Sequence, residues 1–293
     1  MIPIIIVTHN NASTINRTIS ALMKTTFDFD EIKIFIIDNN STDNTPYILN
    51  TIKDDRITVL FLKRNLGFPA AVILGLLHAK PTTYFALLNP DAIPTPYWLQ
   101  RLYEVMENDP KIGIAQSLLV HPDGTIDSAG GFLNFLGYPV EVKKPLDSKP
   151  YSAMYAKGAA VLVRVSAYKE AGGFDPRFFF YYDETDLCAR MRKKGYKVVV
   201  VPDSIVFHIG LGSRIKCKEL FVLYYMERNR LFYIFKNEPF KLPLALTTAL
   251  LGITKEKGIR RYVRKKAVLD FISLAHGHKL NEPFNPCLRY NKS

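Results

Sequence analysis

The sequence predicts an α/β protein with a mostly parallel central sheet flanked by helices, followed by a mainly helical, basic C-terminal extension. Short runs rich in Ile, Val and Phe alternate with helical patterns, and polar turns bound each run, as in a sheet covered on both faces. The charge is divided unevenly: positions 1–210 hold 22 Lys and Arg against 21 Asp and Glu, and positions 211–293 hold 17 against 6. The formal net charge of +12 therefore comes almost wholly from the C-terminal segment.

Strands and helices are expected to alternate along the chain. Helices are expected from about Ser13, after Pro46, from about Phe68, over residues 98–106 and over residues 166–173. In the last of these, Ser166 is the expected N-cap and Gly172 or Gly173 the stop. Residues 121–150 are rich in Gly, Pro and Asp and predict hairpins and a loop. The expected strands cover residues 2–9, 32–38, 57–62, 83–89, 111–117, 159–165 and 196–202.

Polar residues follow several of the expected strands, for example Thr8 to Asn10, Asp38 to Thr45 and Lys63 to Gly67. In an open parallel sheet, ligands bind at the carboxyl ends of the strands. The phosphate-binding patterns GxGxxG and GxxxxGK[ST] are both absent, so a nucleotide would be held mainly by side chains. Asp38 is well placed to accept hydrogen bonds from a base or ribose, although an N-cap or an Asx turn would explain it equally simply.

Two further residues could meet a diphosphate or a metal. Asp91, in "LLNPDA", follows a buried strand, and a carboxylate there could hold Mg²⁺ or Mn²⁺, whose other positions take diphosphate oxygens. The alternative for Asp91 is ordinary turn chemistry. His208, in "IVFHIGLGS", could be a second metal ligand, and the glycines after it could expose backbone N–H groups to an anion. A structural histidine is the alternative.

The segment "FFFYYDETDLCAR" places three carboxylates, Asp183, Glu184 and Asp186, directly after five aromatic residues. Carboxylates beside apolar walls tend to have perturbed pKa values, which indicates proton transfer or metal chemistry. The alternative is the solvated first turn of a helix, where the helix dipole favours acidic residues. Asp186 could equally pair with Arg190 one turn later.

Taken together, these segments resemble family 2 glycosyltransferases of the GT-A fold, in particular the rhamnosyltransferase-like branch. The family patterns T-Y-N, VDNxSxD, NxGFAxAxNxG, LNPDA, GGFDExFFxYxEDxDLCxR and HxxGxS appear here in order. Their counterparts are "VTHNN", "IDNNSTDNT", "NLGFPAAVILG", "LNPDA", "GGFDPRFFFYYDETDLCAR" and "HIGLGS". The chain departs from the family at His9, at Ile73 and in the order of the acidic pair Asp183–Glu184.

The resemblance implies a metal-dependent, inverting transferase that moves a sugar from a nucleotide-sugar donor to a hydroxyl group of a glycan or lipid-linked acceptor. It implies a catalytic GT-A domain over residues 1–213, with a nucleotide-binding part over about 1–95 and an acceptor-binding part over about 96–213, before the extension over 214–293. The cofactor would be Mg²⁺ or Mn²⁺. The implied roles are catalysis for Glu184, as the base, and Asp183; donor binding for Thr8, Asn10, Asp38, Asn65, Gly67 and Asp91; acceptor binding for Asp186 and Tyr182; and metal binding for Asp91 and His208.

The basic extension suggests an anionic partner. The alternation of apolar and basic segments would suit attachment to an anionic membrane surface, where the protein could meet a membrane-borne acceptor. A helical packing element with a solvated basic face is an equal alternative, and nucleic acid is not expected because no binding module accompanies the charge. Three cysteines without a CxxC pair predict no disulfide framework or zinc site, and hence a reducing, cytoplasmic compartment. If the extension binds membrane, the protein would be peripheral on the inner face of the membrane. The competing function is a catalytically degenerate nucleotide- or glycan-binding protein.

Overall fold

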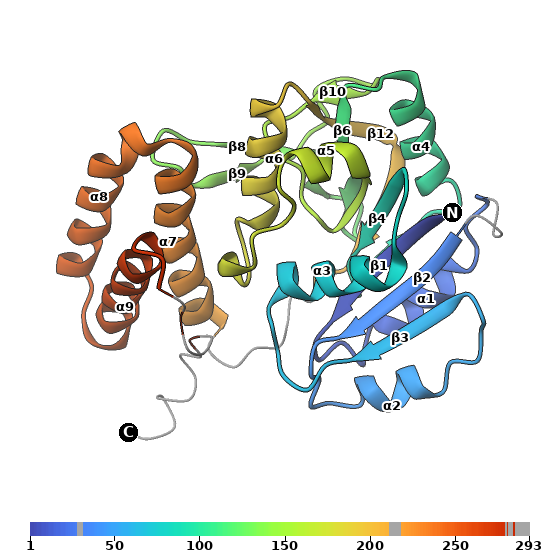
Figure 1. Cartoon of the computed structure of the whole chain (residues 1–293), viewed down its shortest axis with the longest axis horizontal. Helices are drawn as coiled ribbons and strands as arrows, with labels where there is room; N and C mark the ends of the chain where they lie inside the picture. Colours follow the sequence, from blue (N-terminus) through green and yellow to red (C-terminus); the bar gives the residue numbers. More distant parts are fainter. Residues whose placement is uncertain (28–31, 211–217, 279, 281–283, 285–293) are drawn as a thin grey trace.

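The computed structural model describes residues 1–27, 32–210, 218–278, 280 and 284. The strands among these residues form a ten-stranded sheet (Figure 1). The strands follow the order β10-β12-β6-β11-β4-β1-β2-β3, with β5 beside β12 and β7 beside β6. A separate hairpin pairs β8 with β9. The strands are β1 (Ile2–Thr8), β2 (Ile32–Asp38), β3 (Ile57–Phe61), β4 (Tyr84–Leu88), β5 (Ala92–Pro94), β6 (Ile112–Val120), β7 (Ile126–Ser128), β8 (Gly131–Leu133), β9 (Pro139–Glu141), β10 (Tyr151–Ser152), β11 (Ala160–Arg164) and β12 (Lys197–His208).

The predicted parallel sheet is confirmed for its main strands. β1 pairs in parallel with β2 and β4, β2 with β3, and β6 with β12. Only β11 among the long central strands runs the other way, antiparallel to both β4 and β6. Because the register sets Thr8 opposite Asp38, the last residues of β1 and β2 lie side by side at one edge of the sheet.

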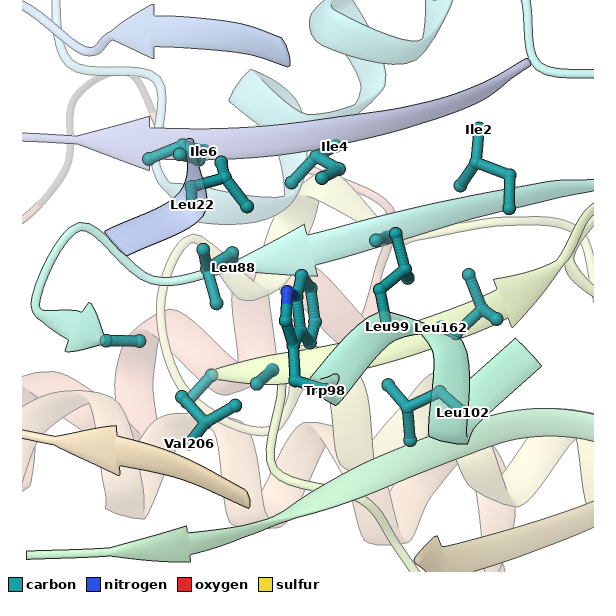
Figure 2. Packing of buried hydrophobic residues seen from close by; sticks show 14 of the residues in the cluster. Ile2, Ile4, Ile6, Leu22, Leu88, Trp98, Leu99, Leu102, Leu162 and Val206 are labelled. Atoms are coloured by element: carbon teal, nitrogen blue, oxygen red, sulfur yellow. The ribbon is translucent and has the colours of Figure 1, made fainter. Parts of the chain in front are cut away.

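Helices cover both faces of the sheet. Helices α1 and α4 pack on one face, where Trp98, Leu99 and Leu102 meet Ile4 and Leu88 in a fully buried cluster (Figure 2). Helices α3, α5 and α6 pack on the other face. This double cover explains why the central strands are apolar at nearly every position. The helices of this body are α1 (Ile15–Leu22), α2 (Thr45–Asn50), α3 (Phe68–Ala79), α4 (Trp98–Asn108), α5 (Val165–Glu170) and α6 (Asp183–Lys193), with a short 3₁₀ helix over Pro176–Phe178.

One boundary was predicted wrongly. Helix α5 begins at Val165, its N-cap is Arg164, and no side chain caps it. Ser166 therefore lies inside the first turn, because β11 runs into the helix without an intervening turn residue. The helix ends at Glu170, just before the predicted stop at Gly172. The hairpins predicted between residues 121 and 150 are present as β7, β8 and β9.

The C-terminal segment is helical, as expected: α7 (Lys218–Asn237), α8 (Leu242–Lys255) and α9 (Gly258–Ala275) gather beyond α6, with α8 outermost (Figure 1). Another 3₁₀ helix covers Pro239–Lys241. Arg228 and Arg230 of α7 are both buried, so this helix is a packing element at those positions, whereas the membrane role of the extension stays a prediction. Within the described ranges, no helix combines the length and the apolar character needed to cross a bilayer. The predicted boundary at residue 213 lies outside the described residues.

Candidate active site

The predicted donor residues lie at the ends of β1, β2 and β3, as parallel strands require. Thr8 is buried and its hydroxyl donates to Asn11 Oδ1 at 3.2 Å. Asn10 is exposed, and its Oδ1 accepts a hydrogen bond from the backbone N–H of Thr42 at 2.7 Å. Asp38 is buried, and its Oδ2 accepts from the backbone N–H of Ser41 at 3.1 Å. The Asx-turn alternative for Asp38 is therefore present, and its nucleotide role stays a prediction.

A buried amide, Asn39, organises this edge and was not among the predicted site residues. Its Oδ1 accepts from the backbone N–H of Leu66 at 2.8 Å, and its Nδ2 donates to Asn65 Oδ1 at 3.0 Å. Asn65 Oδ1 in turn accepts from the N–H of Gly67 at 2.9 Å. Asn39 thus ties the end of β2 to the loop before α3. Its position beside Asp38 in "DNNSTD" was the available signal.

Asp91 and His208 lie together, as the metal prediction requires. His208 is the last residue of β12, Asp91 directly precedes β5, and the pairing of these strands brings His208 Nε2 within 3.3 Å of Asp91 Oδ1. Both side chains are almost fully buried. On its other side, His208 Nδ1 lies 2.7 Å from Asp127 Oδ2. Asp127 comes from β7 and was not predicted, because its segment was interpreted as a hairpin of Gly, Pro and Asp.

Charge is concentrated around Asp127. Lys157 Nζ lies 2.8 Å from Asp127 Oδ2 and 3.0 Å from Oδ1. Burial raises the pKa of Asp127, but the hydrogen bonds from His208 and Lys157 outweigh it and leave that pKa far below its usual range. Burial lowers the pKa of His208, whereas the two carboxylates Asp127 and Asp91 raise it, to about 9 overall. With a pKa of about 9, His208 is protonated at neutral pH even beside Lys157, and it bridges the two acids.

Asp91 and His208 fit as ligands of a divalent metal ion whose other ligands would come from the substrate. A neutral His208 that donates from Nδ1 to Asp127 presents the lone pair of Nε2 toward Asp91, and this carboxylate–histidine arrangement is typical of metal-ligating histidines. No group of three or more Asp, Glu, His or Cys side chains forms a metal cage among the described residues. Two protein ligands suit a cation whose remaining positions are filled by diphosphate oxygens and water. Of the two glycines after His208, Gly210 is described and Gly212 lies outside the described residues.

Asp183 and Glu184 are the first two residues of α6. Asp183 is 1% exposed, and its Oδ2 has no hydrogen-bond partner. Burial, and next the charge of Glu184, raise the pKa of Asp183 well above its ordinary value. Burial also raises the pKa of Glu184. Because the two carboxyls cannot both ionise readily, Asp183 holds the proton and Glu184 is the ionised, more accessible carboxylate.

Glu184 fits against Gly158, which precedes β11 at the same edge of the sheet. A Cβ atom at residue 158 would lie 2.5 Å from Glu184 Oε1 and 2.8 Å from its Cγ, so only glycine leaves room for this carboxylate. The neighbouring residue is Lys157, whose Nζ reaches Asp127. Two consecutive residues, Lys157 and Gly158, therefore contact both Asp127 and Glu184 and link Glu184 to the group formed by Asp127, His208 and Asp91.

The two predicted acceptor residues are buried. Both carboxylate oxygens of Asp186 are occupied, by Arg190 Nη2 at 2.6 Å, Lys236 Nζ at 3.1 Å and Asn237 Nδ2 at 2.8 Å. The alternative pairing with Arg190 is thus present, and the contacts join α6 to α7. Tyr182 is 3% exposed, and its hydroxyl donates to the carbonyl of Gly137 at 2.8 Å. The acceptor role of both residues remains a prediction.

The aromatic run before Asp183 packs mainly on α7, as ordinary core packing predicts. Phe178 lies 5.1 Å from the ring of Phe232, and Phe179 stacks on Tyr225 at 5.2 Å. Further along, Phe180 faces Phe221 at 5.9 Å. The run therefore serves first to attach the acidic segment to the C-terminal helices. Cys188, in α6, is fully buried, as expected of a small core residue.

The family of the chain is decided by a match to the model for glycosyl transferase family 2 over residues 4–172, more than half of its length. The chain belongs to glycosyl transferase family 2. A curated relative is the N-acetylglucosaminyl-diphospho-decaprenol L-rhamnosyltransferase of Mycobacterium tuberculosis, which is 26% identical over 71% of this chain and 76% of the relative. The predicted likeness to rhamnosyltransferases is confirmed at this level.

Solved structures show that this family 2 glycosyltransferase has the GT-A fold. One neighbour is GalNAc-T7 with UDP, GalNAc and Mn²⁺, with a TM-score of 0.65 and 19% identity; the alignment covers 79% of this chain but just 47% of the neighbour. Another is the mannosyltransferase PcManGT from Pyrobaculum calidifontis in complex with GDP-Man and Mn²⁺, with a TM-score of 0.59 and 16% identity over 99% of this chain and 78% of the neighbour. At these identities the likeness concerns the fold.

Proposed function

We propose that this family 2 glycosyltransferase is a metal-dependent, inverting enzyme that transfers a sugar from a nucleotide-sugar donor to a hydroxyl group of a lipid-linked or glycan acceptor. One observation carries the proposal: a carboxylate of raised pKa, Glu184, is joined through Lys157 and Gly158 to the Asp91–His208 pair at the carboxyl edge of the sheet. This arrangement supports the proposal of a proton acceptor and a cation-binding pair in one site.

Glu184 would take the proton of the acceptor hydroxyl group as its oxygen attacks the anomeric carbon. Asp183, protonated behind it, would keep Glu184 ionised by donating a hydrogen bond. Attack opposite the departing diphosphate in a single displacement inverts the anomeric configuration. A Mg²⁺ or Mn²⁺ ion held by Asp91 and His208 would supply positive charge to the diphosphate oxygens as they leave. Asp127 would orient His208 by accepting from Nδ1.

The nucleotide would lie across the ends of β1 to β3, against Thr8, Asn10, Asp38, Asn65 and Gly67. The polar side chains that follow these strands, the absence of glycine-rich phosphate patterns and the nucleotide-bound neighbours support this placement. The name of the mycobacterial relative supports a rhamnosyl donor and a polyprenyl diphosphate-linked acceptor, as used in polysaccharide biosynthesis.

A lipid-linked acceptor requires the enzyme to work at a membrane, and the outer face of α8 suits that position. No charged residue occurs between Leu242 and Thr254, although this helix lies at the edge of the molecule (Figure 1). Leu250 is 55% exposed and Leu251 51% exposed. Lys241 and Lys255 flank the uncharged stretch, as expected of a helix that lies on anionic lipid. The helix also packs inward through Ala245 and Ala249, so the packing alternative describes its inner face.

The test of the proposed activity is thermal stabilisation by a panel of nucleoside diphosphates, with and without Mn²⁺, on wild type and Asp91→Ala, followed by turnover of the donor that binds. Stabilisation by one nucleotide that needs Mn²⁺ and Asp91, together with product of inverted configuration, is expected. Nucleotide binding without transfer to any polyprenyl-linked or glycan acceptor would favour the catalytically degenerate binding protein instead.

A further inference from the structure

The chain takes an unfavourable path just before Glu184. Phe179, Tyr181 and Tyr182 have φ values of 64°, 66° and 66°, in the left-handed region that bulky side chains rarely occupy. Non-glycine residues persist there only when their surroundings fix them. The segment Arg177–Tyr182, here called the aromatic loop, therefore needs partners outside itself to keep its shape.

Those partners come from α7, more than forty residues later in the chain. Asn229 Nδ2 lies 2.9 Å from the carbonyl oxygen of Phe178, 2.7 Å from that of Phe180 and 2.8 Å from that of Tyr181. The side chain of Asn229 is fully buried. A single amide group thus satisfies three carbonyls of one loop.

Arg228 fixes the orientation of this amide and extends the contact. Its Nε donates to Asn229 Oδ1 at 2.8 Å, which leaves Nδ2 directed at the carbonyls. Its Nη2 donates to the carbonyls of Arg177 at 2.9 Å and Phe178 at 2.6 Å. The remaining carbonyl of the run, that of Phe179, accepts from the backbone N–H of Phe68 at 2.8 Å.

The contact with Phe68 connects the aromatic loop to the predicted binding site of the nucleotide-sugar donor. Phe68 is the first residue of α3, and Gly67 before it approaches so closely that a Cβ there would lie 2.4 Å from the Phe179 carbonyl oxygen. The aromatic loop is therefore held between α7 and the start of α3. Its far end leads directly into Asp183 and Glu184.

We propose that Asn229 is a positioning residue for catalysis: by holding the aromatic loop against α3, it sets the place of Glu184 relative to the bound donor. This inference rests on the proposed role of Glu184 as the base. A buried asparagine that served only packing would not need three carbonyl acceptors and an arginine to orient it. An error of about 1 Å in the place of a catalytic group can reduce turnover 100-fold.

The experiment compares kcat and the donor KM of wild type, Asn229→Ser, Asn229→Ala and Asn229→Asp, measured at a temperature where circular dichroism shows each variant folded. We expect kcat to fall about 10- to 100-fold. The loss should be largest in Asn229→Asp, because this change replaces the hydrogen-bond-donating amide with a carboxylate oxygen that faces the carbonyl oxygens of the loop. The donor KM and Mn²⁺ affinity should stay within twofold, because Asn229 touches no predicted donor or metal residue. Arg228→Lys, which loses the bond to Asn229, should show a milder loss of kcat.

Leu274→Ala is the matched control. Leu274 is buried in α9 in the same C-terminal core, and the change removes packing without removing any hydrogen bond. It should lower the melting temperature while leaving kcat unchanged. A folded Asn229 variant with kcat within twofold of wild type, or one that differs from Leu274→Ala only in thermal stability, would overturn the proposal. Glu184→Gln separates the proposed role of Glu184 as the base from the proposed role of Asn229. If Glu184→Gln keeps full turnover, the assignment of the base is wrong, whatever the Asn229 variants show.

Discussion

His208 and Asp127 are joined by a hydrogen bond of 2.7 Å between Nδ1 and Oδ2, and this bond leaves Nε2 of the imidazole facing Asp91. The relationship makes Asp127 a determinant of metal affinity although it does not face the cation itself. Asp127→Asn should weaken Mn²⁺ binding about 10- to 100-fold, because the amide can no longer hold the imidazole in the ligating tautomer. Titration of Mn²⁺ followed by electron paramagnetic resonance measures this, with Asp123→Asn in the nearby exposed turn as control. Equal affinities in the two variants would contradict it.

Gly158→Ala tests the space around Glu184. The added methyl group would meet Glu184 Oε1 at 2.5 Å, so the carboxylate must move or the loop must shift. We expect a loss of kcat of at least tenfold and a destabilisation of roughly 1–3 kcal/mol, as for overpacking in a filled core. Gly195→Ala is the comparison, since no atom lies within 4 Å of a Cβ there and its cost comes from the backbone alone. Steady-state kinetics and thermal melts distinguish the two.

The acidic pair can be separated by isosteric amides. Glu184→Gln should reduce kcat about 100- to 10,000-fold, the usual contribution of general base catalysis. Asp183→Asn should keep substantial turnover, because its amide still donates to Glu184. If the asparagine variant is the inactive one and the glutamine variant is active, Asp183 is the base.

The same Asp183→Asn variant predicts a change in stability with pH. The pKa of Asp183 is raised in the folded protein, so the folded state holds this proton more tightly than the unfolded chain does. The resulting stability is complete below the unfolded pKa of 3.8 and is lost as pH rises through the folded pKa. Relative to wild type, the variant should therefore gain stability as pH rises from 4 toward 8, which urea unfolding at several pH values would measure. A constant difference across this range would refute the assignment of the proton.

Asp186 separates a structural role from acceptor binding. Its carboxylate is fully buried between Arg190 and Lys236, so Asp186→Asn should lower the free energy of unfolding by about 3–5 kcal/mol, because Arg190 loses its carboxylate and Lys236 keeps only Asp175. The acceptor KM of the folded variant should stay unchanged. A raised acceptor KM with little loss of stability would restore the acceptor role that the sequence predicts.

The outer face of α8 predicts vesicle binding. Leu250→Glu with Leu251→Glu should reduce binding to anionic phospholipid vesicles at least tenfold, since burying each leucine contributes about 1.5–3 kcal/mol. Turnover of a water-soluble acceptor analogue should not change. Thr247→Glu with Thr254→Glu adds the same charge to the same helix as a control for electrostatics. Vesicle binding that is unaffected by the leucine changes, or wild-type dimers that these changes dissociate, would assign the face to another partner.

The sequence pattern predicts the sheet well, because strands buried on both faces must be apolar throughout and helices must alternate with them. The resemblance to family 2 glycosyltransferases, and not the pattern, implies the proximity of Asp91 and His208, which the long-range pairing of β5 with β12 produces. Asp127 escapes prediction because its partners His208 and Lys157 come from distant parts of the chain, and the hairpin pattern around it gives no sign of them. Ser166 illustrates a local error, in which a residue of high capping preference follows a strand that runs straight into the helix.

The sequence does not show that Arg228 and Arg230 are buried. Backbone carbonyls and Glu227 supply their partners, which only the folded chain brings into place. Their charges are thus not available to a membrane, and among the lysines beside α8 it is the exposed Lys255 that could supply that attraction. The composition gives the number of charged residues but not which of them are buried.

The contacts between α7 and the aromatic loop also limit how this enzyme can be recombined with its relatives. The family match ends at residue 172, and a chimera joined there with foreign C-terminal helices would confront the loop carbonyls with an unmatched surface. Such a hybrid should be soluble only if residues 177–182 and α7 are inherited from the same parent. In evolutionary terms, the aromatic loop and the C-terminal helices form one unit of exchange, whereas the nucleotide side meets this loop through Gly67 and Phe68.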